Sequence, residues 1–163
     1  TEQAGGQYHA AAVGEVNVVN QMKAVDAIIG GEGNGGVIYP EAHYGRDALV
    51  GIALFLSHLA LYGKPISQLR ASYPSYFISK NKITLTPDMD IDALLEKVRE
   101  KYKEYPHSTI DGLKIEFEKE WVHLRKSNTE PIIRIYSEAA VEARAEELAQ
   151  MIIADMKQIL QID

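Results

Sequence analysis

Residues 30–36 form the densest glycine run of the chain, Gly30-Gly31-Glu32-Gly33-Asn34-Gly35-Gly36. Its only two side chains, Glu32 and Asn34, offer a carboxylate that accepts hydrogen bonds and an amide that both donates and accepts them. Bare glycine backbone lets a ligand come close, and such groups suit the hydroxyls of a sugar. The run therefore predicts a sugar-binding loop. A flexible hairpin connection without a ligand is the alternative.

The same run fits the dinucleotide-binding pattern Gly-x-Gly-x-x-Gly, but it predicts no nucleotide site. That pattern needs a helix that opens directly at the glycines, so that the helix N-terminus meets the pyrophosphate. Here Val37-Ile38-Tyr39-Pro40 follows and breaks any such helix. A phosphate-binding Gly-Lys-Ser/Thr sequence is absent as well.

A second cluster, between residues 125 and 134, is rich in hydrogen-bond donors. Its members suited to an anion are Arg125, Ser127, Asn128, Thr129 and Arg134. Two guanidinium groups, two hydroxyls, an amide and loop N–H groups within ten residues predict a phosphate site. From Arg125 to Arg134 the local charge is +3 − 1 = +2, in a chain whose net charge is −6. The alternative is a solvated turn in which Ser127 and Thr129 bind their own backbone.

The residue types argue against disulfides and metal sites. The chain has no cysteine, which excludes disulfides and zinc–thiolate sites, and its five histidines show no metal-ligand spacing. Asp88, Asp90 and Asp92 imitate the spacing of a magnesium loop. The apolar residues among and after them, however, favour a helix start capped by Asp90. The roles of Glu15 and His43 stay open.

The amino-acid composition limits the kinds of protein that this chain can be. The 163 residues are 46% hydrophobic and 25% charged, which is typical of a globular protein. The acidic balance argues against nonspecific binding of nucleic acid or of an anionic membrane. No apolar run approaches the roughly 20 residues that span a bilayer. We therefore expect a soluble, cytoplasmic protein.

Two groups of elements would position the two loops. In the first, we expect a short helix and then a buried strand around Ile28–Ile29, followed by a helix over 46–62 that is apolar nearly all round and ends at Gly63. Residues 64–76 would link this group to the next.

The second group predicts an antiparallel sheet covered on one face by helices. The expected elements are a strand over 78–85, a helix capped by Asp90, a turn at Asp111-Gly112, strands over 113–117, 121–124 and 132–136, and a helix capped by Ser137 that runs to about Leu160. Glu138 and Glu142 would lie in the first turns of that last helix.

At these loops the sequence resembles the α-D-phosphohexomutases, which include phosphoglucosamine mutase, phosphomannomutase and phosphoglucomutase. The resemblance rests on four stretches: Val13-Gly14, GGEGNGGVIYPEAHYGRDAL (30–49), DGLKIEF (111–117) and WVHLRKSNTEPIIRIYSEA (121–139). It implies that residues 1–73 are the later part of the third, α/β domain. Residues 74–163 would form the fourth, α+β domain, similar in fold to the TATA-binding protein.

The resemblance also implies roles for the loop residues. Glu32 and Asn34 would contact sugar hydroxyls. Arg125, Ser127, Asn128, Thr129 and Arg134 would bind the substrate phosphate. The family often has Ser at position 34 and His at position 36, and Glu15 stands where some members place a sugar-contacting His.

In the family, the phosphoryl-carrying serine and the magnesium loop belong to the first two domains, and neither motif occurs here. The resemblance therefore implies a C-terminal fragment, inactive alone, of an enzyme that interconverts hexose 1- and 6-phosphates. The enzyme would use Mg²⁺, bound outside this fragment, and a hexose 1,6-bisphosphate. The partners would be the phosphosugar and the missing N-terminal domains, and the fragment could self-associate. The alternative is a non-catalytic phosphosugar-binding or interaction module.

Overall fold

The computed structural model describes residues 1, 4–84, 86, 89–127 and 130–161. The backbone divides into two compact units, Thr1–Pro74 and Ser75–Asp163. The division falls one residue after the expected boundary between residues 73 and 74.

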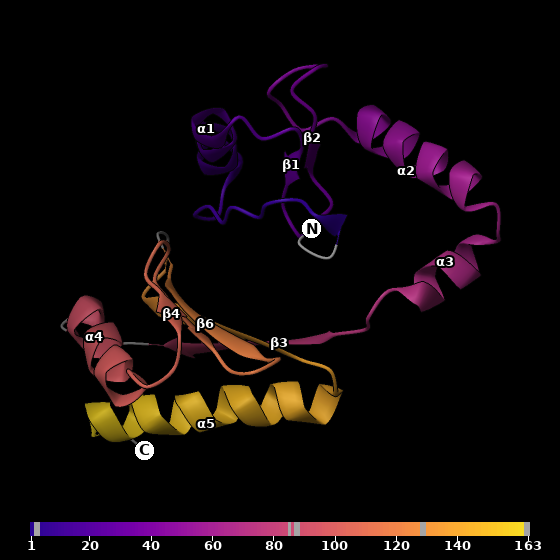
Figure 1. Cartoon of the computed structure of the whole chain (residues 1–163). Coiled ribbons are helices and arrows are strands. Elements are labelled where there is room, and N and C mark those ends of the chain that lie inside the picture. Colours follow the sequence, from indigo (N-terminus) through magenta and orange to yellow (C-terminus); the bar gives the residue numbers. More distant parts are fainter. Residues whose placement is uncertain (2–3, 85, 87–88, 128–129, 162–163) are drawn as a thin grey trace. The chain divides into compact units, whose positions relative to one another are not determined.

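The first unit contains three helices and a small hairpin (Figure 1). Its elements are α1 (Glu15–Val25), β1 (Gly30–Gly31), β2 (Val37–Ile38), α2 (Ala48–Tyr62) and α3 (Ile66–Ser72). Strands β1 and β2 pair antiparallel, with Gly30 opposite Ile38 and Gly31 opposite Val37. The hairpin therefore presents residues 32–36 as its connecting loop.

Local chemistry sets the ends of α2. Asp47 caps the N-terminus, because its side chain accepts a hydrogen bond from the Val50 N–H at 3.0 Å. Gly63 ends the helix in the left-handed conformation, with φ of 68°. This helix and its end at Gly63 agree with the sequence-based expectation.

One expectation for the first unit is wrong, and another is incomplete. Ile28 and Ile29 precede β1 and are exposed, with 83% of the Ile28 surface accessible, because the two-stranded hairpin offers no layer that covers them. Residues 64–76, expected to link the two groups, hold the boundary between the two units and also contain α3. Pro65 stands at its N-terminus, where the fixed φ of proline suits a helix start, and Leu69 is buried.

The second unit is a five-stranded sheet with two helices. Its elements are β3 (Phe77–Thr84), α4 (Ile91–Lys101), β4 (His107–Ser108), β5 (Leu113–Glu116), β6 (Trp121–Lys126), β7 (Ile132–Ala139) and α5 (Glu142–Leu160). The strand order is β3-β7-β6-β5-β4, and every neighbouring pair is antiparallel. The short strand β4 was not expected from the sequence.

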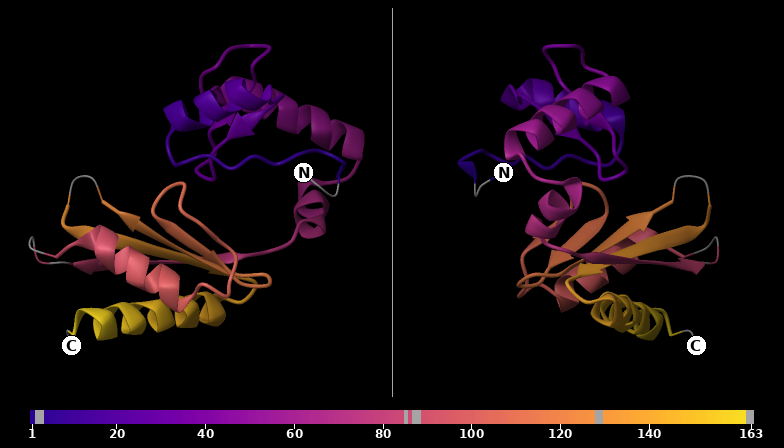
Figure 2. Two further views of the ribbon diagram at one scale, coloured as in Figure 1. Left: turned by 60° about the vertical axis from the view of Figure 1, so that its left-hand side comes forward. Right: turned by 90° about the vertical axis from the view of Figure 1, so that its right-hand side faces the viewer.

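Both helices of the second unit cover the same face of the sheet (Figures 1 and 2). The core between them contains Leu94 and Val98 of α4, Leu148, Ile152 and Met156 of α5, and Ile115, Leu124 and Ile135 of the sheet. The alternating apolar positions face the helices, and the positions between them, which include Lys80, Lys82, Arg125 and Arg134, lie on the other face. The expected helix-covered antiparallel sheet is confirmed.

The start of α5 differs from the expectation. Ser137 does not cap the helix: it lies buried in β7, and its hydroxyl donates to the carbonyl of Ala145 at 2.6 Å. Strand β7 stays extended to Ala139 because it pairs with both β3 and β6. Glu138 is therefore also in the strand, where it accepts a hydrogen bond from Nε1 of Trp121 at 3.0 Å.

Within the described residues, no single helix is both long and apolar enough to cross a membrane. Helices α2 and α3 meet that length and composition test only when taken together, and they are bent by 92° at the break between them.

Candidate functional site

The glycine run forms a tight hairpin loop. The Glu32 N–H donates to the Gly36 carbonyl and the Gly35 N–H to the Glu32 carbonyl, both at 3.1 Å. Gly35 has a φ of 96°, which side chains of L-residues disfavour. A Cβ on Gly31 would lie 2.3 Å from the Gly36 carbonyl oxygen. The hairpin alternative is thus correct as a description of the backbone, and this backbone presents Glu32 and Asn34.

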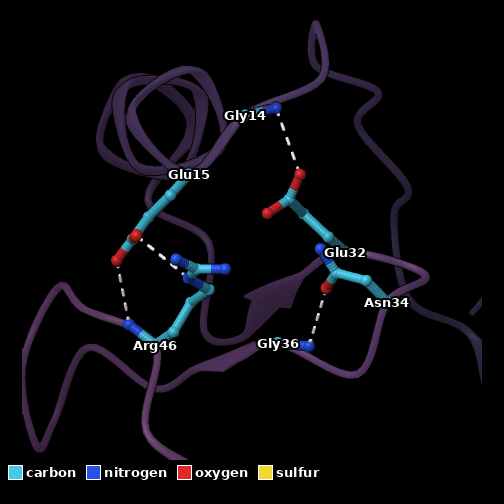
Figure 3. Close-up of polar contacts among 6 residues, drawn as sticks. All are labelled: Gly14, Glu15, Glu32, Asn34, Gly36 and Arg46. Atoms are coloured by element: carbon cyan, nitrogen blue, oxygen red, sulfur yellow. Dashed lines mark hydrogen bonds and ion pairs between the residues drawn. The ribbon is translucent and has the colours of Figure 1, made fainter.

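Glu32 and Asn34 each make one hydrogen bond that orients the side chain (Figure 3). One carboxylate oxygen of Glu32 accepts from the Gly14 N–H, and the side-chain oxygen of Asn34 accepts from the Gly36 N–H, both at 3.1 Å. Gly14 is the N-cap of α1, a position that favours a negative charge. Among the described residues, the second Glu32 oxygen and the Asn34 amide N–H groups have no hydrogen-bond partner. This carboxylate oxygen and these N–H groups are therefore available to form hydrogen bonds with a ligand.

Glu15, whose role the sequence left open, binds Arg46. Its two oxygens accept from the backbone N–H of Arg46 at 3.1 Å and from Nε at 2.9 Å (Figure 3). The backbone N–H of Arg46 is the largest cause that lowers the pKa of the Glu15 carboxyl, and its guanidinium adds to the effect. A Cβ on Gly36 would lie 2.8 Å from Cδ of Arg46. The Arg46 stem therefore lies against the loop, and Glu15 holds it there.

His43 binds the residue that caps α2. Its Nε2 lies 3.0 Å from a carboxylate oxygen of Asp47. The Val50 N–H and then the His43 ring lower the pKa of Asp47. This contact joins His43 to the start of α2.

Glu32 and Asn34 border a hollow of about 720 Å³ within the first unit. Its other walls include Val18, Met22 and Val25 of α1 together with the N-terminal segment. The two polar side chains are suited to a sugar, whereas the α1 wall is apolar.

The second cluster is built on the hairpin of β6 and β7. Arg125 of β6 and Arg134 of β7 are direct partners across the strands, so their side chains share one face. Ser127 follows β6 and is buried, and its N–H donates to the Ile132 carbonyl at 3.0 Å. The structure thus brings three of the five expected phosphate ligands together. Asn128 and Thr129 lie outside the described residues.

Asp111 is a partner of this cluster that sequence reasoning missed. Its carboxylate lies 3.0 Å from Nε of Arg125. The next residue, Gly112, has a φ of 77°, and a Cβ there would lie 2.2 Å from the Leu124 carbonyl oxygen. The Asp111-Gly112 turn was expected, but only the strand register shows that it brings a carboxylate to Arg125.

The acidic run before α4 is a helix cap where it is described. A carboxylate oxygen of Asp90 accepts from the Ala93 N–H at 3.0 Å, as expected, and Asp88 lies outside the described residues. In the part of the chain that the structure describes, no three His, Asp or Glu side chains form a group that could hold a metal ion.

Two domain models of one protein family match the chain, one over each unit. Residues 1–76 match the family model described as phosphoglucomutase/phosphomannomutase, alpha/beta/alpha domain III. Residues 82–155 match the C-terminal domain of the same family.

Curated relatives carry mutase names. The chain is 34% identical to a phosphoglucosamine/phosphogalactosamine mutase of Sulfurisphaera tokodaii and 39% identical to a phosphoglucomutase/phosphomannomutase of Thermococcus kodakarensis. Each alignment covers 91% of this chain and 32% of the relative. The chain thus spans about a third of the length of these relatives.

A solved structure shows the same fold. A phosphoglucomutase/phosphomannomutase family protein of Burkholderia thailandensis matches with a TM-score of 0.77 at 24% identity, over 98% of this chain and 34% of that one. The two domain models and the curated relatives agree with it. The chain therefore belongs to the phosphoglucomutase/phosphomannomutase family, of which it carries domain III and C-terminal domain sequence.

Proposed function

We propose that this chain is the C-terminal part of a phosphohexomutase, which moves phosphate between the 1- and 6-positions of a hexose through a bisphosphorylated sugar. The substrate would be a phosphoglucosamine, phosphomannose or phosphoglucose. The names of the relatives support this range of sugars and do not select among them. On the composition described above, we also propose a cytoplasmic location.

The chain would supply binding and positioning. Glu32 and Asn34 would contact sugar hydroxyls with the carboxylate oxygen and amide N–H groups left over by the hairpin. Arg125, Ser127, Asn128, Thr129 and Arg134 would bind the phosphate. Holding a substrate in a fixed geometry lowers the barrier to its reaction even where the holding groups do no chemistry.

The chemistry would be supplied from outside this chain. The phosphoryl-carrying serine and the magnesium loop would belong to the first two domains of the longer enzyme. A magnesium ion there would neutralise charge that develops on the transferred phosphate.

The observation that best supports the proposal is the pairing of Arg125 and Arg134 beside the β6–β7 loop. Two guanidinium groups on adjacent strands repel each other, and a phosphate dianion between them removes that repulsion. Arg125 already has one carboxylate, that of Asp111, which fixes its orientation.

Titration with glucosamine 6-phosphate, followed by NMR or calorimetry, tests this site. Arg125→Ala should weaken binding about 10- to 100-fold, because a hydrogen bond to a charged group contributes about 1.5–3 kcal/mol. Arg144→Ala is the matched control: this exposed arginine of α5 pairs with Glu120 and lies outside the cluster. Equal affinities for the two variants would remove the β6–β7 loop from the site. In the longer enzyme, Arg125→Ala should raise KM while the fold stays intact.

A further inference from the structure

A third cation lies in register with the two arginines. Lys82 of β3 is the direct partner of Arg134 on β7, which is in turn the partner of Arg125 on β6. The residues next to these three along their strands, Ile83, Ile133 and Leu124, are buried in the helix-covered core. Side chains alternate along a strand, so Lys82, Arg134 and Arg125 form one row on the helix-free face.

This row is electrostatically unfavourable without a counterion. Like charges directly opposite each other on neighbouring strands destabilise a sheet. Asp111 compensates Arg125. Among the described residues, no carboxylate lies within ion-pair distance of Lys82 or Arg134, although the chain as a whole is acidic.

The row lies at the end of the sheet that carries the β6–β7 loop. Thr84, the last residue of β3, pairs with Ile132, the first residue of β7. Lys82 is therefore two residues from the strand end beside which Ser127 binds the Ile132 carbonyl. A side chain as long as that of lysine can reach an anion held at this end.

Lys80 provides the comparison within the same strand. It lies on the same face as Lys82, but its partner is Tyr136, and its Nζ lies 5.7 Å from the centre of that ring. Strand β3 is an edge of the sheet, and lysines commonly protect edges from pairing with other chains. Protection of the edge accounts for the presence of both lysines equally. Only Lys82, however, lies directly opposite an arginine, Arg134, on the neighbouring strand.

We propose that Lys82 is a third cationic ligand of the phosphate site, which extends the site from the β6–β7 loop onto the sheet face. The inference rests on the proposed function, because the ligand is the phosphate monoester of the sugar substrate. The ammonium group acts as a point charge beside the two guanidinium groups and favours the dianion.

The test is a titration of the whole chain with inorganic phosphate, followed by NMR, at fixed ionic strength. Lys82→Ala should weaken binding about three- to tenfold, whereas Lys80→Ala, which removes the same charge from the same strand and face, should weaken it less than about twofold. Lys82→Arg should restore most of the affinity. Without phosphate, Lys82→Ala should not lower the free energy of unfolding, because it removes repulsion.

Two results overturn the proposal in distinguishable ways. If Lys82→Ala and Lys80→Ala weaken phosphate binding equally while Arg134→Ala still weakens it strongly, Lys82 only protects the edge and the inference alone fails. If Arg125→Ala and Arg134→Ala also leave binding unchanged, the phosphate site of the proposed function fails with it.

Discussion

The Glu15 carboxylate binds Arg46 at two points, the backbone N–H and Nε, across 31 residues of sequence. This contact joins the start of α1 to the segment that leads into α2. Because the Arg46 stem lies against Gly36, the contact also supports the loop that presents Glu32 and Asn34.

The Glu15–Arg46 contact should depend on pH in a definite direction. Arg46 lowers the pKa of Glu15 below its usual 4.5. A carboxyl group with a lowered pKa contributes stability above its unfolded-state pKa and loses it as the pH falls through the folded-state value. In an NMR titration, the Arg46 amide resonance should therefore shift with a midpoint below 4.5.

Two variants control this titration. Glu15→Gln should abolish the shift. Glu41→Gln should leave it in place, because the Glu41 carboxylate accepts from the Tyr39 hydroxyl and not from Arg46. A midpoint at or above 4.5 would contradict the contact.

Glu32→Ala should separate sugar recognition from phosphate recognition. Loss of the Glu32 carboxylate should weaken binding of glucosamine 6-phosphate about tenfold, because a hydrogen bond to a charged group is removed. Inorganic phosphate should bind as before. Calorimetric titrations with the two ligands check this, and an equal loss for both would contradict the division of roles between the loops.

Gly112→Ala should destabilise the second unit by more than about 2 kcal/mol. The new Cβ would lie 2.2 Å from the Leu124 carbonyl oxygen, at a residue with positive φ. Gly33→Ala is the control, because a Cβ there meets no atom within 4 Å and its φ is not positive. Urea unfolding measures both changes. If Gly112→Ala unfolds like the unmodified chain, the turn that brings Asp111 to Arg125 is described wrongly.

Most of the sheet and the glycine hairpin were predictable because their determinants are local. Alternating Leu113 and Ile115, the Asp111-Gly112 turn and the cap at Asp90 each act within a few residues. The glycine run likewise indicates a hairpin from local constraints. Gly31 is required by its close contact with the Gly36 carbonyl, and Gly35 by its positive φ.

The predictions failed where contacts between residues far apart in sequence determine the local structure. Ser137 resembles a helix cap, but pairing with β3 and β6 keeps it in a strand. The sequence predicts a link over residues 64–76, and α3, which begins after Pro65 and buries Leu69, lies within it. The contacts of Glu15 with Arg46 and of Asp111 with Arg125 join residues far apart in sequence, so spacing alone could not predict them.

The apolar surface of the first unit should make the isolated chain self-associate. No residue of α2 is buried, and 78% of Leu49 and 88% of Leu61 are exposed. Exposed apolar patches of this kind promote association. Sedimentation velocity should show mass rising with concentration, and Leu49→Gln with Leu61→Gln should reduce the rise. A monomer at all concentrations would show that this surface does not associate.

The central claim is that this chain binds a phosphosugar and leaves phosphoryl transfer to residues outside it. The most direct measurement incubates the chain with a hexose 1-phosphate, its 1,6-bisphosphate and magnesium, and assays the 6-phosphate. The account predicts no turnover by the chain alone. It predicts turnover once the chain is mixed with the part of the Thermococcus kodakarensis relative that lies outside the alignment with this chain. Arg125→Ala in this chain should abolish that turnover. Formation of 6-phosphate by the chain alone would contradict the account.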